Sequence, residues 1–198
     1  MDFMIKAIVF DFFGVIYPDT LSLVTRKFIG FDKQKLAEIR DVRLQCDRGL
    51  IDRDEFWNSV AQIMNVTREQ LDMALQRVQQ ADWKMLELIK ELRSKYKTAM
   101  LSNVGKGFVE RIFSDEKPRA EYFDKLFLSG ETGLLKPNPE AYKDVTKKLD
   151  AEPEEIVFID DIKVNVRAAE ALGMHAILFE DFEQFKKDLS KILADANS

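Results

Sequence analysis

The sequence predicts an α/β fold, with a Rossmann-like parallel sheet, helices on both of its faces and a small all-helical cap. Short apolar runs alternate with helical patterns over residues 82–194, which is typical of a parallel sheet. Another buried strand is expected at residues 5–10 (IKAIVF). Between the two parts, residues 20–80 show only the spacing of amphipathic helices. We therefore expect an α/β core domain at residues 1–16 and 81–198, interrupted by a helical cap domain at 17–80.

Each part of the chain carries its own start and stop signals. In the predicted cap, Asp32, Asp52 and Thr67 precede helical patterns as N-caps, and Gly49 follows one as a stop signal. In the predicted core, the elements are assigned by their periodicity. Strands are expected at 98–103, 125–129, 155–160 and 175–179, and helices over about 82–96, 105–115, 138–149, 163–172 and 181–194.

Composition and charge exclude several classes of protein. The chain has 198 residues and a net charge of −5, which argues against a nucleic-acid partner because phosphate backbones favour basic patches. No apolar run reaches the roughly 18 residues of a membrane span, so no membrane partner is expected. Cys46 is the one cysteine, which fits a reducing cytoplasm. No sequence feature decides the oligomeric state.

Polar residues stand at the ends of three predicted strands and before one helix. They are Asp11, Ser102, Asn103, Lys136, Asp160 and Asp161. Because the carboxyl ends of parallel strands meet at one edge of a sheet, these side chains are expected to converge there. Carboxylates held together repel each other, and a Mg²⁺ ion with hard oxygen ligands relieves the repulsion. A lysine and a hydroxyl beside them suit a phosphate dianion.

Each of these residues also has a common structural role when it is considered alone. An aspartate after a strand is often a helix cap, a serine there is often a turn residue, and a lysine is most often a solvated surface charge. The functional interpretation therefore rests on the whole set, because all its members fall in order at matching strand ends.

At these positions the chain resembles the haloacid dehalogenase (HAD) superfamily, in its subfamily with a helical cap after the first strand. The four motifs of that family fall on DFFGV, LSN, KPNP and FIDDIKVNVRAAEALGM. The resemblance covers nearly the whole chain. It implies a phosphatase that acts on a small phosphorylated metabolite, such as a sugar phosphate, with Mg²⁺ as cofactor.

The resemblance also implies roles for individual residues. Asp11 would be the nucleophile that forms an aspartyl-phosphate, assisted by Lys136 and Ser102. The substrate-binding residues would be Ser102, Asn103, Lys136, Phe12 and Phe13. The metal ligands would be Asp11, the carbonyl of Phe13, Asp161 and Asp160. Asn165 stands where some relatives have another acid, and Gly14 suits the sharp turn after the nucleophile.

Phe13 departs from the pattern of the family. The phosphatases have an aspartate there, whose side chain is the general acid and whose carbonyl binds the metal. Phenylalanine keeps the carbonyl but has no proton to donate, and acid–base catalysis typically contributes ~10²–10⁴-fold. The sequence therefore predicts a slow or specialised phosphatase, or one in which another acid substitutes, such as Asp19 or a residue of the cap. Tyr17 is expected to pack in the turn.

Two alternatives remain open at this point. A 2-haloacid dehalogenase carries an aromatic residue, tyrosine, at the position of Phe13, but lacks the paired acids of the fourth motif. A catalytically impaired relative would bind a phospholigand or a partner. In the cap, Phe56 and Trp57 have core spacing. We expect at most one of the cap arginines to enter the site, the candidates being Arg26, Arg40, Arg43 and Arg48.

Overall fold

A computed structural model describes residues 4–78, 81–110, 113 and 119–196. Five parallel strands form one sheet in the order β3-β2-β1-β4-β5. The strands are β1 (Ala7–Phe10), β2 (Lys97–Ser102), β3 (Lys125–Leu128), β4 (Ile156–Asp160) and β5 (His175–Leu178). The predicted fold class is confirmed, with strands shorter by one or two residues than expected in four of five cases.

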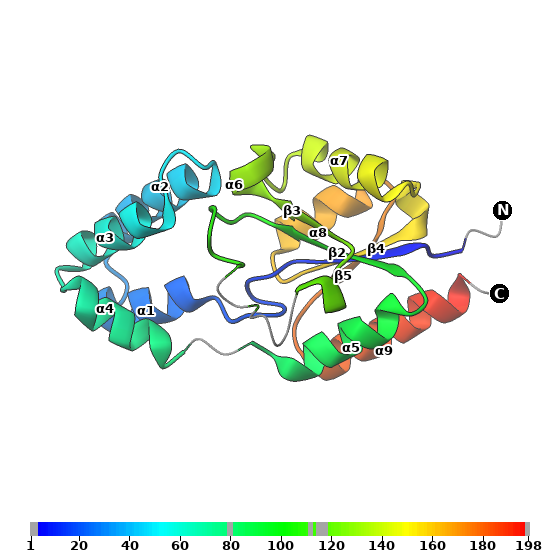
Figure 1. The fold of residues 1–198 in the computed structure, drawn as a ribbon, viewed down its shortest axis with the longest axis horizontal. Coiled ribbons are helices and arrows are strands. Elements are labelled where there is room, and N and C mark those ends of the chain that lie inside the picture. Colours follow the sequence, from blue (N-terminus) through cyan, green and yellow to red (C-terminus); the bar gives the residue numbers. More distant parts are fainter. Residues whose placement is uncertain (1–3, 79–80, 111–112, 114–118, 197–198) are drawn as a thin grey trace.

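Helices cover both faces of the sheet (Figure 1). On one face, α5 (Trp83–Arg93) and α9 (Phe182–Asp195) pack against Ile8 and Phe10 of β1. On the other face, α7 (Pro139–Leu149) and α8 (Lys163–Glu170) pack against the alternate residues of the same strand. Because successive side chains of a strand point to opposite faces, one strand joins the two cores.

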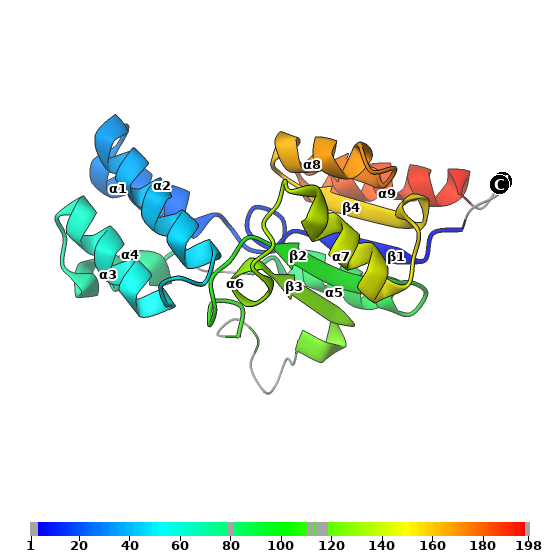
Figure 2. The same cartoon turned by 90° about the horizontal axis from the view of Figure 1, so that it is seen from above.

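The insert after β1 is helical, as predicted. It contains α1 (Thr20–Ile29), α2 (Lys33–Asp47), α3 (Arg53–Met64) and α4 (Arg68–Gln76). These helices bury a hydrophobic core of their own, with Phe56, Trp57 and Leu71 near its centre. They lie beyond the carboxyl ends of the strands (Figures 1 and 2). The upper boundary proposed for this cap, at residue 80, lies outside the described residues.

The predicted N-caps of the insert form in the structure. The Asp52 carboxylate accepts a hydrogen bond from the backbone of Glu55, and the Glu55 carboxylate accepts one from the backbone of Asp52. Thr67 forms the same reciprocal pair with Gln70. Each pair satisfies two backbone groups that the start of a helix leaves without a partner.

Glycines form a seam where the cap touches the core. A methyl group on Gly49 would lie 2.6 Å from the carbonyl oxygen of Gly130, and one on Gly105 would lie 2.4 Å from the sulfur of Cys46. Next to them the Ser129 hydroxyl donates a hydrogen bond of 2.6 Å to the carbonyl of Asp47. Cap and core therefore approach so closely here that only glycine fits at these positions, and the one bulkier contact is made by the sulfur of Cys46.

The prediction of a helix over 105–115 is wrong for the residues of this range that the structure describes. Residues 106–110 form turns and bends, and the rest of it, apart from residue 113, lies outside the described residues. Gly107 has a positive φ of 81°, and the Phe108 ring packs 5.8 Å from that of Phe56 in the cap. Contact with the cap thus overrides the local helical pattern. The sequence also missed the short α6 (Ser129–Thr132) and the 3₁₀ turns η1 (Arg119–Glu121) and η2 (Pro153–Glu155).

Among the described helices, none combines the length and apolar character that crossing a bilayer requires.

Asp52→Ala tests the contribution of the α3 cap to stability. We expect the free energy of unfolding to fall by about 1 kcal/mol, because the start of the helix loses its capping box. Urea unfolding followed by circular dichroism measures the change. The control is Asp41→Ala, an exposed aspartate within α2. Equal stability of the two variants would contradict the expectation.

Candidate active site

Asp11 is the first polar residue after the central strand. Its backbone N–H donates to the carbonyl of Ile159 at 2.8 Å, which extends the pairing of β1 with β4 by one residue. The carboxylate is buried, and it accepts a 2.7 Å hydrogen bond from the N–H of Phe12. Burial raises the pKa of Asp11 to about 6, although the charge of Lys136 opposes the rise.

The ammonium of Lys136 lies between two buried carboxylates. Its Nζ is 2.8 Å from Oδ1 of Asp11 and 2.6 Å from Oδ2 of Asp160. The lysine side chain is 1% exposed. The amide of Asn103 fixes its backbone, because it accepts from the Lys136 N–H and donates to the Lys136 carbonyl, each at 2.8 Å. Lys136 is therefore a fixed charge inside the site and not a surface lysine.

Asp160 also accepts hydrogen bonds from residues that follow it in the chain. The backbone N–H of Ile162 donates to it at 2.8 Å, and the Asn165 side-chain amide lies 3.1 Å from both of its oxygens. Asn165 is buried, and its backbone carbonyl accepts a hydrogen bond from the hydroxyl of Tyr142 at 2.9 Å. The neutral amide thus contacts the carboxylate at the position where some relatives have an acid.

Three carboxylates meet the requirements of a divalent cation. One ligand oxygen each from Asp11, Asp160 and Asp161 lies within 4.8 Å of the others. Asp161 is exposed, and its pKa is raised by partial desolvation and by the charge of Asp160. A methyl group on Gly14 would lie 2.1 Å from an Asp161 oxygen, so the glycine makes room for this carboxylate. Oxygen donors of this kind suit Mg²⁺.

A cavity of about 420 Å³ joins these residues, and we name it the phosphate cavity. Its lining includes Asp11, Phe13, Ser102, Asn103, Lys136 and Asp161. Ser102 is buried at the end of β2, and Asp160 lies behind Lys136. The Phe12 ring is buried in the core, while its N–H faces the Asp11 carboxylate. The structure therefore brings all eight of the predicted site residues to one place.

Phe13 belongs to a cluster of aromatic rings beside Asp11. Its ring is 5.0 Å from that of Phe12 and 5.9 Å from that of Tyr17, both in edge-to-face contacts. Burial raises the pKa of Tyr17 to about 12, which makes its hydroxyl a poor acid near neutral pH. As predicted, Tyr17 packs in the turn. No carboxylate occupies the position that Phe13 fills.

Asp47 is an acid that the sequence analysis did not single out. It is the last residue of α2, and it lines the phosphate cavity together with Arg40 and Arg43. The expectation that at most one cap arginine enters the site is therefore wrong. Burial raises the pKa of Asp47 to about 6, while Arg43, 3.5 Å away, opposes the rise. A negative charge at the carboxyl end of a helix is unfavourable. The sequence shows this unfavourable placement, because Asp47 comes two residues before Gly49, which marks the end of the helix.

Comparison with known proteins identifies a family and several relatives. Residues 5–173 match the family described as haloacid dehalogenase-like hydrolase. The D-ribitol-5-phosphate phosphatase of Bacteroides thetaiotaomicron is 31% identical, over 96% of this chain and 99% of that protein. Flavin mononucleotide hydrolase 1 of Arabidopsis thaliana is 26% identical, over 93% and 76%.

A solved structure supports the same assignment. It is that of a HAD family enzyme from Bacteroides thetaiotaomicron, in complex with magnesium and inorganic phosphate. It superposes with a TM-score of 0.72 at 28% identity and covers 91% of this chain and 98% of its own.

Lys136→Met tests the buried charges. We expect the variant to lose about 3–5 kcal/mol of unfolding free energy at pH 8, because two buried carboxylates lose their counter-charge. Folding raises the pKa of Asp11 from its ordinary 3.8 to about 6. The contribution of Asp11 to the free energy of unfolding is therefore greatest below pH 3.8, and it is lost as the pH rises to about 6. Without Lys136 the pKa of Asp11 in the folded protein rises further. The loss of unfolding free energy in Lys136→Met should therefore be smaller at pH 5 than at pH 8.

Thermal and urea unfolding in EDTA at both pH values measures this difference. The control is Lys143→Met, which removes an exposed lysine paired with Glu140. A deficit that is equal at pH 5 and pH 8, or no larger than that of the control, would contradict the expectation.

Proposed function

The chain belongs to the haloacid dehalogenase-like hydrolase family, and within it we propose a Mg²⁺-dependent phosphatase for a small sugar or polyol phosphate. The observation that carries the proposal is the Lys136 ammonium between Asp11 and Asp160, beside Asp161 in one cavity. Such a site offers a nucleophile, a fixed positive charge and oxygen ligands together. The phosphatase among the relatives and the magnesium and phosphate in the related structure support it.

The first step transfers the phosphoryl group to Asp11. A carboxylate oxygen of Asp11 attacks phosphorus, and the bond from phosphorus to the ester oxygen breaks. The electron pair of that bond goes to the leaving oxygen, which must take up a proton. Lys136 offsets the negative charge of the phosphoryl group, and Ser102, Asn103 and the N–H of Phe13 bind its oxygens, while the N–H of Phe12 holds the Asp11 carboxylate.

We assign the missing proton to Asp47. Phe13 supplies none, and Asp47 presents a carboxyl to the same cavity from the cap side. Burial raises its pKa to about 6, close to neutral pH, which suits a group that both gives and takes a proton. The Ser129 hydroxyl anchors its backbone to the core.

The second step regenerates the enzyme. Water attacks the phosphorus of the aspartyl-phosphate while the Asp47 carboxylate takes one of its protons. The bond from phosphorus to the Asp11 oxygen then breaks, which restores the carboxylate and releases inorganic phosphate.

Asp11, Asp161 and the carbonyl of Phe13 would hold Mg²⁺, with Asp160 beside them. When bound there, the ion supplies charge stabilisation for the phosphoryl oxygens.

Phosphate release from ribitol 5-phosphate, glucose 1-phosphate, acetyl phosphate and p-nitrophenyl phosphate tests the function. We expect turnover that requires Mg²⁺ and is abolished in Asp11→Asn, because the nucleophile is removed. Halide release from 2-chloropropionate without metal would instead indicate a dehalogenase. Binding of phosphate with no turnover of any ester would favour a binding protein.

Asp47→Asn tests the source of the proton. For ribitol 5-phosphate we expect kcat to fall by ~10²–10⁴-fold, because an alkoxide leaves poorly without a proton. The first turnover of p-nitrophenyl phosphate should be retained, because a nitrophenolate leaves without one. Rapid-quench measurement of alcohol release separates the two.

Two further variants decide the assignment. Asp41→Asn removes an exposed carboxylate from the same helix and should not change kcat. Asp19→Asn removes another carboxylate that lines the phosphate cavity. If the loss follows Asp19 and not Asp47, the assignment of the acid is wrong.

A further inference from the structure

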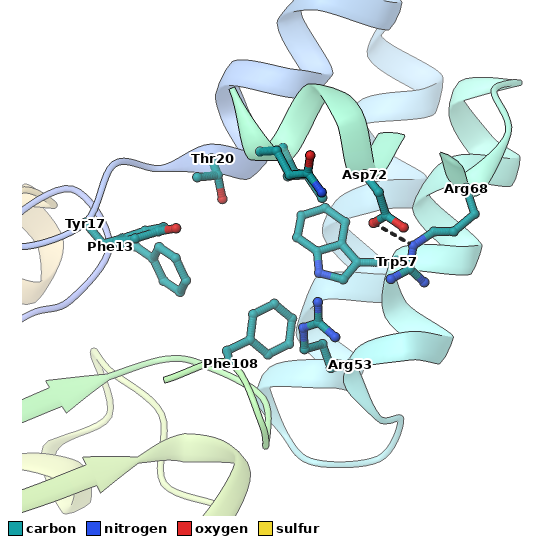
Figure 3. Close-up of a pocket in the computed structure, with 10 residues that line it drawn as sticks. Phe13, Tyr17, Thr20, Arg53, Trp57, Arg68, Asp72 and Phe108 are labelled. Atoms are coloured by element: carbon teal, nitrogen blue, oxygen red, sulfur yellow. Dashed lines mark hydrogen bonds and ion pairs between the residues drawn. The ribbon is translucent and has the colours of Figure 1, made fainter. Parts of the chain in front are cut away.

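A second cavity, of about 310 Å³, lies where the cap meets the core, and we name it the junction cavity. Its lining comes from the turn after β1, the start of α1, the helices α3 and α4, and the loop after β2 (Figure 3). It shares Phe13 with the phosphate cavity, but its lining includes none of Asp11, Lys136 and Asp161. The reaction above therefore assigns no role to this space.

Three buried side chains present polar groups to the junction cavity. Tyr17, Thr20 and Trp57 line it and are 7%, 4% and 3% exposed. Figure 3 shows the two hydroxyls on one side of the cavity and Trp57 on the other. Within the part of the chain that the structure describes, no hydrogen bond satisfies these hydroxyls or the indole N–H. Buried polar groups normally have partners, so these three indicate a ligand.

The three groups have in common that each can donate a hydrogen bond. The indole N–H of Trp57 can only donate. Burial raises the pKa of Tyr17 to about 12, so its hydroxyl keeps its proton near neutral pH. The Thr20 hydroxyl can turn its proton into the cavity. A ligand that satisfies all three groups must bring acceptor oxygens.

The charged residues of the lining favour a ligand with one negative charge. Arg68 and Asp72 pair at 2.9 Å, so their charges offset each other (Figure 3). Arg53 adds a positive charge. Its guanidinium also lies 3.1 Å from Asp54, but that carboxylate is 71% exposed, so water screens the pair. One net positive charge faces the cavity, which suits a carboxylate better than a phosphate dianion.

We propose that the junction cavity is a second ligand site, which binds a small free monocarboxylate. Its oxygens accept hydrogen bonds from Trp57, Tyr17 and Thr20, while Arg53 supplies the opposite charge. The cavity exceeds the roughly 30 Å³ that one water molecule occupies and reaches the lower end of the range of ligand sites, about 300 Å³. This inference goes beyond the proposed function, because it needs no group that reacts with phosphate.

A ligand at this place would join the cap to the core. Tyr17 and Thr20 belong to the segment through which the chain enters the cap, whereas Arg53 and Trp57 belong to α3. A carboxylate that accepts from both sides stabilises the arrangement of cap and core in which its donors converge. The site is therefore suited to an effector that holds the cap in place.

The fluorescence of Trp57 provides a direct test. Trp57 and Trp83 are the two tryptophans of the chain, so Trp83→Phe leaves Trp57 as the reporter. Gluconate and glucitol are matched probes, because a carboxylate in the first replaces a hydroxymethyl group in the second. In EDTA and at constant ionic strength, we expect gluconate to change the fluorescence saturably at millimolar concentrations and glucitol to have no effect. Equal responses, or no saturable response to gluconate, would overturn the site.

Thr20→Val and Tyr17→Phe each remove one hydroxyl and keep the shape of the side chain. In the Trp83→Phe background, each should weaken gluconate binding about 10-fold, because a hydrogen bond to a charged group is lost. Without ligand, each should unfold at a Tm no lower than that of the parent, because a buried polar group without a partner is removed.

The control is Thr25→Val, on the same helix as Thr20. The Thr25 hydroxyl is already bonded, at 2.8 Å, to the carbonyl of Leu21. This variant should lower the Tm and leave gluconate binding within about 2-fold of the parent. An equal loss of binding in Thr20→Val and Thr25→Val would contradict the assignment of the donors.

A last measurement separates this site from the reaction site. Saturating Mg²⁺ and inorganic phosphate should leave the gluconate titration unchanged, because phosphate occupies the phosphate cavity. Displacement of gluconate by phosphate would place gluconate beside Asp11 and overturn the inference. Fluorescence reports binding and not turnover, so a protein without phosphatase activity could still bind gluconate here, and an active phosphatase could fail to bind it.

Discussion

The ammonium of Lys136 between Asp11 and Asp160 is the interaction on which the rest of the site depends. Two buried carboxylates this close cannot both stay ionised without a positive charge between them. The reciprocal bonds with Asn103 and the amide of Asn165 then fix the lysine and its partner in place. Asp11 is thereby kept as a fixed, partly neutralised carboxylate before any substrate arrives, which lowers the cost of reorganisation during the reaction.

Much of the core and its site could be predicted from the sequence, because both follow from local patterns. Apolar runs separated by helical spacing define a parallel sheet, and the rule that ligands lie at the carboxyl ends of strands brings Asp11, Ser102 and Asp161 together. The rest depends on contacts between distant segments. Residues 105–110 have helical spacing, yet Phe108 packs on the cap and prevents a helix. Asp47 becomes a site residue only because the end of α2 rests on the core at Ser129.

Phe13 lines the phosphate cavity together with Asp11. Its ring packs against the rings of Phe12 and Tyr17. A carboxylate in its place would donate a proton, but it would put a charge into an aromatic wall, where an unpaired charge is costly. We propose that Asp47 supplies the proton instead, because it lines the same cavity from the end of α2 in the cap.

The glycine seam between cap and core has a consequence for how such a protein can diverge. Any side chain at Gly49 or Gly105 would have to displace a backbone carbonyl or the sulfur of Cys46, and so lift the end of α2. Asp47, the last residue of α2, would then shift in the phosphate cavity, although neither glycine lines that cavity. The proposed role of Asp47 therefore restricts substitution at Gly49 and Gly105, where only a residue without a side chain fits.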